Sequence, residues 1–186
     1  MTVPLASLDV VRADLALAGY RLEGRPEACT GGPAGSRCET CDALDTKHAI
    51  DILALDRRGR PVFIGYRRQD QPRPGGGPPY DYPTITIRKR TARGGSDTEY
   101  RKILTGRARF DIFIQSYTTR LIVATVDGLR NALRYPPLWQ CKLPDYRHGP
   151  EEYTNSYDGT VYHVLCVACM GATEIRRVPL AEAVSA

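Results

Sequence analysis

The fold of this chain is decided by residues 48–66, which read HAIDILALDRRGRPVFIGY. Residues 48–55 alternate apolar and polar side chains in the manner of a half-buried strand, and residues 61–66 have the composition of a returning strand. Between them, residues 56–59 (DRRG) supply the side chains of a tight hairpin turn. We therefore predict a β-hairpin with Asp51 inside its first arm.

The segments on either side of this hairpin predict an α/β protein with a mixed central sheet flanked by helices. A Gly-, Pro- and Cys-rich loop is expected over residues 25–45. Capping and periodicity place helices at residues 7–18, 96–104 and 127–134 and further strands at residues 84–89, 110–115, 121–126, 161–165 and 172–178. Residues 1–137 are expected to form the α/β core, and residues 138–186 an extension whose last two strands form a hairpin packed on it.

Six cysteines in 186 residues include two Cys-x-x-Cys pairs, Cys38/Cys41 and Cys166/Cys169. Two such pairs supply the four thiolates of a tetrahedral zinc site, and a site closed by four protein ligands is structural because it has no position for water. We expect one Zn²⁺ to bind this set and to hold the C-terminal hairpin against the Cys-rich loop.

A second arrangement uses all six thiols and two zinc ions. One ion would bind Cys29, Cys38, Cys41 and His48 within a single loop, and the other would bind Cys141, His148, Cys166 and Cys169. The first residues show neither a basic leader nor a long apolar run, so we expect cytoplasmic, reduced cysteines and no membrane association.

Positive charge is concentrated in the middle of the chain. The net charge is only +5, yet residues 57–109 hold 14 Lys or Arg against 4 Asp or Glu. A local surplus of this size is typical of a surface that binds a polyanion such as DNA or RNA. The expected nucleic-acid-binding residues are Arg57, Arg58, Arg60, Arg67, Arg68, Arg88, Lys89, Arg90 and Arg93.

The order of elements, with an Asp in the first arm of the hairpin, resembles the PD-(D/E)xK nuclease superfamily, which has the restriction-endonuclease-like fold. That resemblance implies that Asp51 is the first metal-binding acid and that the acid and lysine of the D/E-x-K motif lie on the returning strand. Here those two positions are Gly65 and Arg67. Glycine cannot bind a metal, and arginine does not readily exchange a proton because its pKa exceeds about 12.

A carboxylate and an ammonium group can also come from the next helix, where Glu99 and Lys102 lie one turn apart. Three functions therefore remain open. The first is a nucleic-acid-binding protein with a nuclease-like fold that has lost catalysis. The second is an active nuclease that uses Mg²⁺ or Mn²⁺ with Asp51, Glu99 and Lys102. The third is a zinc-stabilised module that binds a protein partner.

Overall fold

A computed structural model describes residues 8–26, 29–32, 36, 38–69, 81, 83–91, 98–134, 151–155 and 159–177. The helices are α1 (Leu8–Ala18), α2 (Glu39–Asp42), the π-helical segment η3 (Ala43–Lys47), α3 (Glu99–Leu104), α4 (Val126–Arg134) and α5 (Val167–Met170). The strands are β1 (Arg21–Gly24), β2 (Ile52–Leu55), β3 (Pro61–Arg68), β4 (Thr84–Arg90), β5 (Ile112–Ser116), β6 (Arg120–Thr125), β7 (Glu151–Thr154), β8 (Val161–Cys166) and β9 (Thr173–Arg176). The prediction of an α/β protein with a mixed sheet is confirmed.

The larger sheet has six strands in the order β1-β2-β3-β5-β6-β9. The predicted hairpin is present: β2 and β3 pair antiparallel, with Ile52 opposite Ile64. Strand β5 then joins the other side of β3 in the parallel direction, and β6 pairs antiparallel with β5. One parallel pair among antiparallel neighbours makes this sheet mixed.

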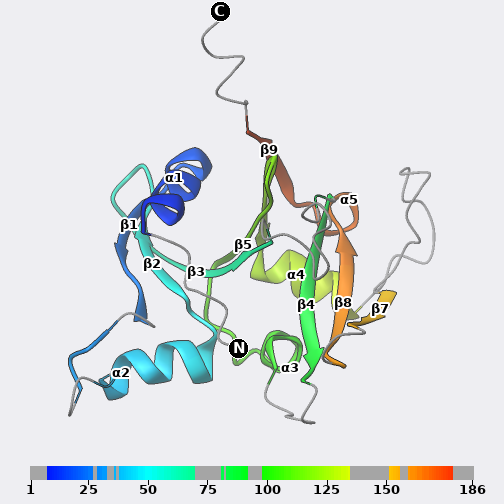
Figure 1. The fold of residues 1–186 in the computed structure, drawn as a ribbon, viewed down its shortest axis with the longest axis horizontal. Coiled ribbons are helices and arrows are strands. Elements are labelled where there is room, and N and C mark those ends of the chain that lie inside the picture. Colours follow the sequence, from blue (N-terminus) through cyan, green and yellow to red (C-terminus); the bar gives the residue numbers. More distant parts are fainter. Residues whose placement is uncertain are drawn as a thin grey trace, which may run out of the picture.

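The smaller sheet has three strands in the order β4-β8-β7. Strand β4 was predicted from its alternating sequence, but its place in a separate sheet was not. It pairs antiparallel with β8, so that Thr84 lies opposite Cys166. Figure 1 shows β4 and β8 side by side, facing the larger sheet.

The predicted C-terminal hairpin is wrong, although both of its arms are strands. Strand β8 pairs with β4 and β7, whereas β9 pairs with β6 at the edge of the larger sheet. The short helix α5 lies between them and ends at Gly171, which has the left-handed conformation (φ of 61°) that is common at the end of a helix. The described residues after 150 therefore contribute strands to both sheets.

Two groups of buried side chains lie on opposite faces of the larger sheet. On one face, Val11 and Leu15 of α1 pack against Ile52, Ile64 and Ile114. On the other face, α3, α4 and the smaller sheet cover a core whose buried residues are Ile85, Ile87, Ile103, Phe110, Phe113, Ile122, Leu129 and Leu165, among others. Figure 1 shows α1 on the β1–β3 side and α4 between the two sheets.

Helix α1 is also tied to the sheet by a buried charge. Asp14 is 1% exposed and accepts hydrogen bonds from Tyr66 Oη (2.6 Å) and Arg177 Nη2 (2.5 Å). Arg177 Nη2 also donates to Ser116 Oγ (2.7 Å). Burial and the hydrogen bond with the Asp14 carboxylate raise the pKa of Tyr66 above its ordinary value, so the phenol remains a donor.

We expect Asp14→Ala to lower the free energy of unfolding by about 3 kcal/mol, because it leaves the Arg177 charge and the Tyr66 hydroxyl without their acceptor. Chemical denaturation measures the change. Asp9→Ala on the same helix is the control, since the Asp9 side chain is 92% exposed and its loss should cost less than about 0.5 kcal/mol. Equal effects of the two substitutions would contradict a buried role for Asp14.

Candidate functional site

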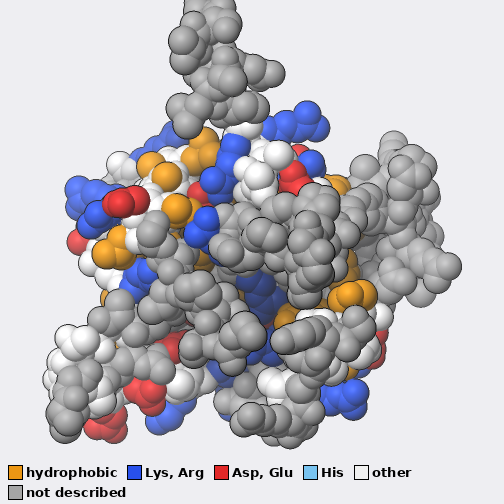
Figure 2. All heavy atoms as spheres, viewed as in Figure 1, with side chains coloured by type: hydrophobic (Ala, Val, Ile, Leu, Met, Phe, Trp, Pro, Cys, Tyr) orange, Lys and Arg blue, Asp and Glu red, His pale blue; other side chains and the backbone are white. Residues whose placement is uncertain are grey.

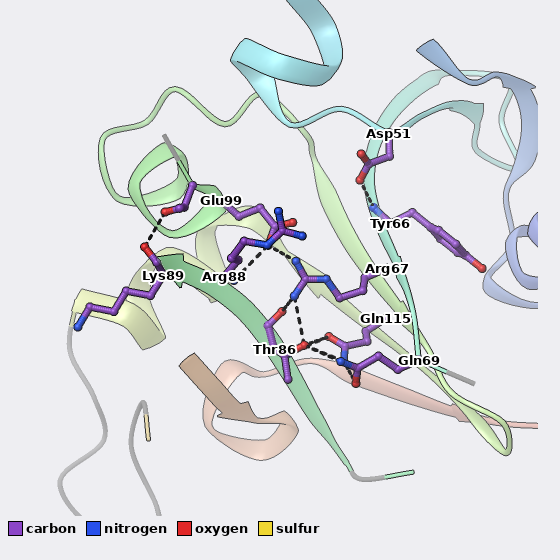
Figure 3. A network of polar contacts seen from close by, with 10 residues as sticks. Asp51, Tyr66, Arg67, Gln69, Thr86, Arg88, Lys89, Glu99 and Gln115 are labelled. Carbon is purple, nitrogen blue, oxygen red and sulfur yellow. Dashed lines mark hydrogen bonds and ion pairs between the residues drawn. The ribbon is translucent and has the colours of Figure 1, made fainter. Parts of the chain in front are cut away.

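The edge of β4 that faces away from β8 is paired with side chains instead of a strand. The backbone groups of Thr84, Thr86 and Arg88 point to this edge, since the intervening residues face β8. Thr84 O accepts from Tyr117 Oη (2.6 Å), and Thr86 N donates to Gln115 Oε1 (2.8 Å). Figure 3 shows the contact between Thr86 and Gln115, which lies between the two sheets. A buried backbone N–H or C=O group without a hydrogen bond destabilises the fold, so these side chains supply the hydrogen bonds that a neighbouring strand would otherwise provide.

Arg67 is the centre of this network. Its Nη1 donates to Thr86 O (2.5 Å) and Thr86 Oγ1 (3.2 Å), and its Nη2 forms an ion pair with Glu99 Oε2. The guanidinium also lies over the rings of Phe113 and Tyr162, with Cζ 6.0 and 5.7 Å from their centroids. Its side chain is 13% exposed, so Arg67 joins the two sheets instead of facing a ligand in solvent.

Glu99 is held as an anion by its neighbours. Burial by itself raises the pKa of this carboxyl, but the charges of Arg67 and Arg88 outweigh burial and hold the pKa below its ordinary value. Arg88 N also donates to Glu99 Oε2 (3.2 Å). The carboxylate that sequence analysis offered as a relocated metal ligand is thus already neutralised by two cations.

Asp51 lies one residue before β2 and beside this network. Its Oδ2 accepts from Tyr66 N (2.7 Å), and its own N donates to Ile64 O (3.0 Å). Asp111 does the same on the opposite side of β3, where its Oδ2 accepts from Phe63 N (2.8 Å). Both carboxylates therefore complete the hydrogen bonding of β3. The Asp51 charge is also one of those that raise the pKa of Arg67 against the effect of burial.

Lys102 does not accompany Glu99. Although the two residues are one helical turn apart, Lys102 is 7% exposed and its Nζ donates to Thr46 O in η3. This contact satisfies a carbonyl near the end of a helical segment, where a cation is favoured. The structure thus separates the predicted catalytic residues: Glu99 pairs with Arg67, and Lys102 with η3.

Gly65 occupies the position of the second acid, and the space that a side chain would need is filled. A Cβ built on Gly65 would lie 2.8 Å from Phe113 Cδ2 and 3.3 Å from Phe110 Cδ1. Both rings are buried in the core between the sheets. Gly65 therefore lacks a carboxylate, and the packing of the two rings also leaves no space for a side chain at this position.

The predicted nucleic-acid-binding residues do not form one surface. Arg57, Arg58 and Arg60 are exposed at the β2–β3 turn, and Arg88 and Arg90 are exposed on β4 of the other sheet. Of these, Arg60 pairs with Asp56 (2.7 Å). Lys89 pairs with Glu152 and Arg67 with Glu99, and Arg68 is half-buried. Arg93 lies outside the described residues. Figure 2 shows basic side chains dispersed over the visible face, several of them toward its middle.

Three cysteines of the Cys-rich loop form a cluster that can hold a metal ion. The sulfur atoms of Cys29, Cys38 and Cys41 all lie within 4.8 Å of one another, and Cys29 Sγ is 3.6 Å from Cys38 Sγ. Two thiolates bound to one zinc ion at about 2.3 Å would lie about 3.8 Å apart. Cys38 also caps α2, because its sulfur accepts from Cys41 N (3.4 Å), so the helix fixes the spacing of this pair.

The thiols of this cluster differ in acidity. A hydrogen bond from the Cys38 backbone, joined by one from Gly31 N (3.4 Å), lowers the pKa of Cys29 to about 7. Hydrogen bonds with Cys38 and Cys29 raise the pKa of Cys41 to about 12. One thiol therefore ionises readily while another resists, and a bound divalent cation would stabilise the fully deprotonated set.

The four-thiolate set predicted from Cys-x-x-Cys spacing differs from this cluster. Cys166 is buried at the end of β8 and is not part of the cluster, and Figure 1 shows α2 and α5 on opposite sides of the molecule. The cluster instead agrees with three members of the alternative local site. Its fourth member, His48, lies beyond η3 with its Nδ1 3.2 Å from Arg107 O. Cys141, His148 and the side chain of Cys169 lie outside the described residues.

Sequence analysis missed Gln115 and Thr86, which carry much of the network. Gln115 is fully buried, and its Nε2 donates to Gln69 Oε1 (2.8 Å) and Tyr117 Oη (2.7 Å). A glutamine within the otherwise apolar strand IFIQS was a usable signal, because a polar side chain on a buried strand needs partners.

Comparisons with protein-family models, curated proteins and solved structures found no match to this chain. Within the described ranges, none of the helices has the length and apolar character needed to cross a membrane.

Substitution of single cysteines distinguishes the two metal-binding sets. We expect Cys29→Ser, Cys38→Ser and Cys41→Ser each to abolish stoichiometric metal binding and to lower the melting temperature, because each removes a thiolate from the cluster. Cys166→Ser is the matched control and should retain the metal. Elemental analysis of the purified variants measures their metal content, and thermal denaturation measures their melting temperature. Loss of metal in Cys166→Ser with retention in Cys29→Ser would contradict this ligand set.

The Arg67–Glu99 pair predicts a specific dependence of stability on pH. Because the pKa of Glu99 is lower in the folded protein than its ordinary value of 4.5, the pair stabilises the fold above that value and loses its effect as pH falls through the folded pKa. Glu99→Gln should therefore be less stable than the wild type at pH 7, and the difference should shrink below pH 4.5. Denaturant titrations at several pH values measure this, and a difference independent of pH would contradict it.

Proposed function

We propose that this protein binds nucleic acid without cleaving it, on a nuclease-like α/β core that also carries a structural zinc ion. The observation on which this conclusion rests is the state of the metal-binding positions that the resemblance implies. The second acid is replaced by Gly65, which is packed against aromatic rings, and the two substitutes, Glu99 and Lys102, are engaged elsewhere.

The architecture supports the proposed resemblance. The hairpin β2–β3 is followed by β4, which belongs to the smaller sheet, and then by helix α3 and strand β5, which joins β3 in the larger sheet. This is the order in which the resemblance places its two motif strands and the helix and strand that complete the core. Asp51 directly precedes β2, the strand on which the first acid is expected.

Arg67 is the strongest argument against catalysis. A lysine at this position would offer a point charge to the scissile phosphate or its attacking water, whereas the Arg67 guanidinium is committed to Thr86 and Glu99. Among the described residues, Asp51 is not part of a group of three or more His, Cys, Asp or Glu side chains close enough to hold one metal ion. One carboxylate is a poor site for Mg²⁺, which needs further ligands in octahedral geometry.

Zinc is the metal that best fits the cysteine cluster. Three thiolates are soft ligands, and in a reduced cytoplasmic environment a cluster of this kind favours zinc over calcium or magnesium. A structural role is supported by the position of the cluster, which joins Cys29 to the start of α2, the helix that leads through η3 to Asp51 and β2.

The proposal predicts binding without cleavage. End-labelled single-stranded, duplex and branched DNA, and a matching RNA, should bind in a gel-shift assay and weaken steeply as salt rises. The same mixtures with Mn²⁺ should stay uncut, and Asp51→Ala should behave as the wild type. Cleavage lost in Asp51→Ala would show an active nuclease instead. Binding of no nucleic acid at low salt would reject the proposal.

Packing at Gly65 can be tested separately. Gly65→Ala should lower the free energy of unfolding by about 1–3 kcal/mol, because the added methyl group overlaps the Phe113 ring. Gly24→Ala is the control, since its Cβ would meet only Leu53 Cδ1 at 3.7 Å. Thermal denaturation of both variants measures the contrast, and a neutral Gly65→Ala would mean that the site has room for a side chain.

A further inference from the structure

A second group of basic residues lies at the end of η3 and in the loop between α3 and β5. Its members, which we call the basic edge, are Lys47, Arg101, Arg107 and Arg109. All four are exposed. Arg101 belongs to α3, and none of the four was among the residues predicted to bind nucleic acid.

Backbone contacts hold these residues together on one part of the surface. Arg109 N donates to His48 O (3.0 Å), and His48 Nδ1 lies 3.2 Å from Arg107 O, so the end of η3 is docked on the loop. Within the loop, Thr105 N donates to Arg101 O (3.0 Å), and Arg107 Nε lies 3.4 Å from Thr105 Oγ1. The basic edge is therefore presented by a structured segment.

Three of the four cations of the basic edge are not neutralised by a carboxylate of the described residues. No carboxylate in the described part of the chain forms an ion pair with Lys47, Arg101 or Arg109. Nearby arginines of α4 bind the end of α3: Arg130 Nε donates to Ile103 O (3.1 Å) and Arg134 Nη2 to Leu104 O (2.8 Å). These contacts occupy the carbonyls at the end of α3, which would otherwise attract the cations of the basic edge.

We propose that the basic edge is where the phosphate backbone of a nucleic acid binds. The inference rests on the proposed function and assigns its contact surface. Three of the four side chains are arginines, whose planar guanidinium groups can bind phosphate oxygens in pairs. The surface begins at Lys47, four residues before Asp51, on the segment that leads into β2. Phosphate contacts of this kind hold the strand without reading its sequence.

Composition favours nucleic acid over a membrane. A helix or loop that binds a lipid surface places apolar side chains beside its cations. Among described residues, the large apolar side chains that are exposed are Leu8, Leu17, Phe63 and Tyr153. None of these belongs to η3, α3 or the loop that follows α3.

The test compares two triple variants with the same loss of charge. Lys47→Gln/Arg101→Gln/Arg109→Gln removes most of the basic edge. Arg12→Gln/Arg21→Gln/Arg176→Gln is the control, because these side chains are 63%, 75% and 86% exposed on α1, β1 and β9. Fluorescence anisotropy measures the affinity for a labelled 20-nucleotide DNA, single-stranded and duplex, between 50 and 200 mM salt. Melting temperatures verify that both variants fold.

For the first variant we expect at least a tenfold weaker affinity and a salt slope reduced by about 2 to 3, one phosphate contact for each lost charge. The control should stay within about threefold of the wild type. Equal weakening in both variants, or none in the first, would overturn the basic edge while leaving the proposed function intact. Failure of the wild type to bind either this DNA or an RNA of the same sequence would overturn both. Binding to vesicles with about 30% phosphatidylserine in place of nucleic acid would have the same meaning.

Discussion

The guanidinium of Arg67 is the contact on which the arrangement of the two sheets depends. It reaches from β3 to the backbone of β4 and pairs with Glu99 on α3, so that three elements meet at one cation. Around it, Gln115 and Tyr117 complete the unpaired edge of β4. A buried ion pair of this kind adds little net stability but strongly penalises its own disruption. It therefore specifies where the smaller sheet docks.

The same constraint accounts for the character of the candidate site. An arginine used to join two sheets cannot also act as a catalytic lysine, and the carboxylate that it neutralises is no longer available to a metal ion. Gly65 adds a steric reason, because Phe113 fills the place of a second acid. The residues that the resemblance would assign to catalysis thus serve the packing of this fold, while cations at the surface remain available for binding.

Local signals in the sequence were sufficient to predict most helices and strands, but they were insufficient to predict which strands pair with one another. Helix α1 and the β2–β3 hairpin follow from periodicity and turn residues within about 20 positions. The pairing of β4 with β8 and of β9 with β6 depends on contacts between distant segments, which alternation alone cannot specify. For the metal site, the spacing of Cys38 and Cys41 was informative. The equal spacing of Cys166 and Cys169 favoured that second pair over Cys29, which lies in the same loop as Cys38 and Cys41.

The pairing of β4 also constrains the order in which the chain can fold during synthesis. Strands β1, β2, β3, β5 and β6 are complete once Thr125 has been made, so five strands of the larger sheet can assemble early. Strand β4 must wait for β8, which begins only at Val161. Until then its inner edge can be covered by side chains of the larger sheet, while its outer edge stays open to other chains. During synthesis, β4 therefore has no strand to pair with until β8 has been made.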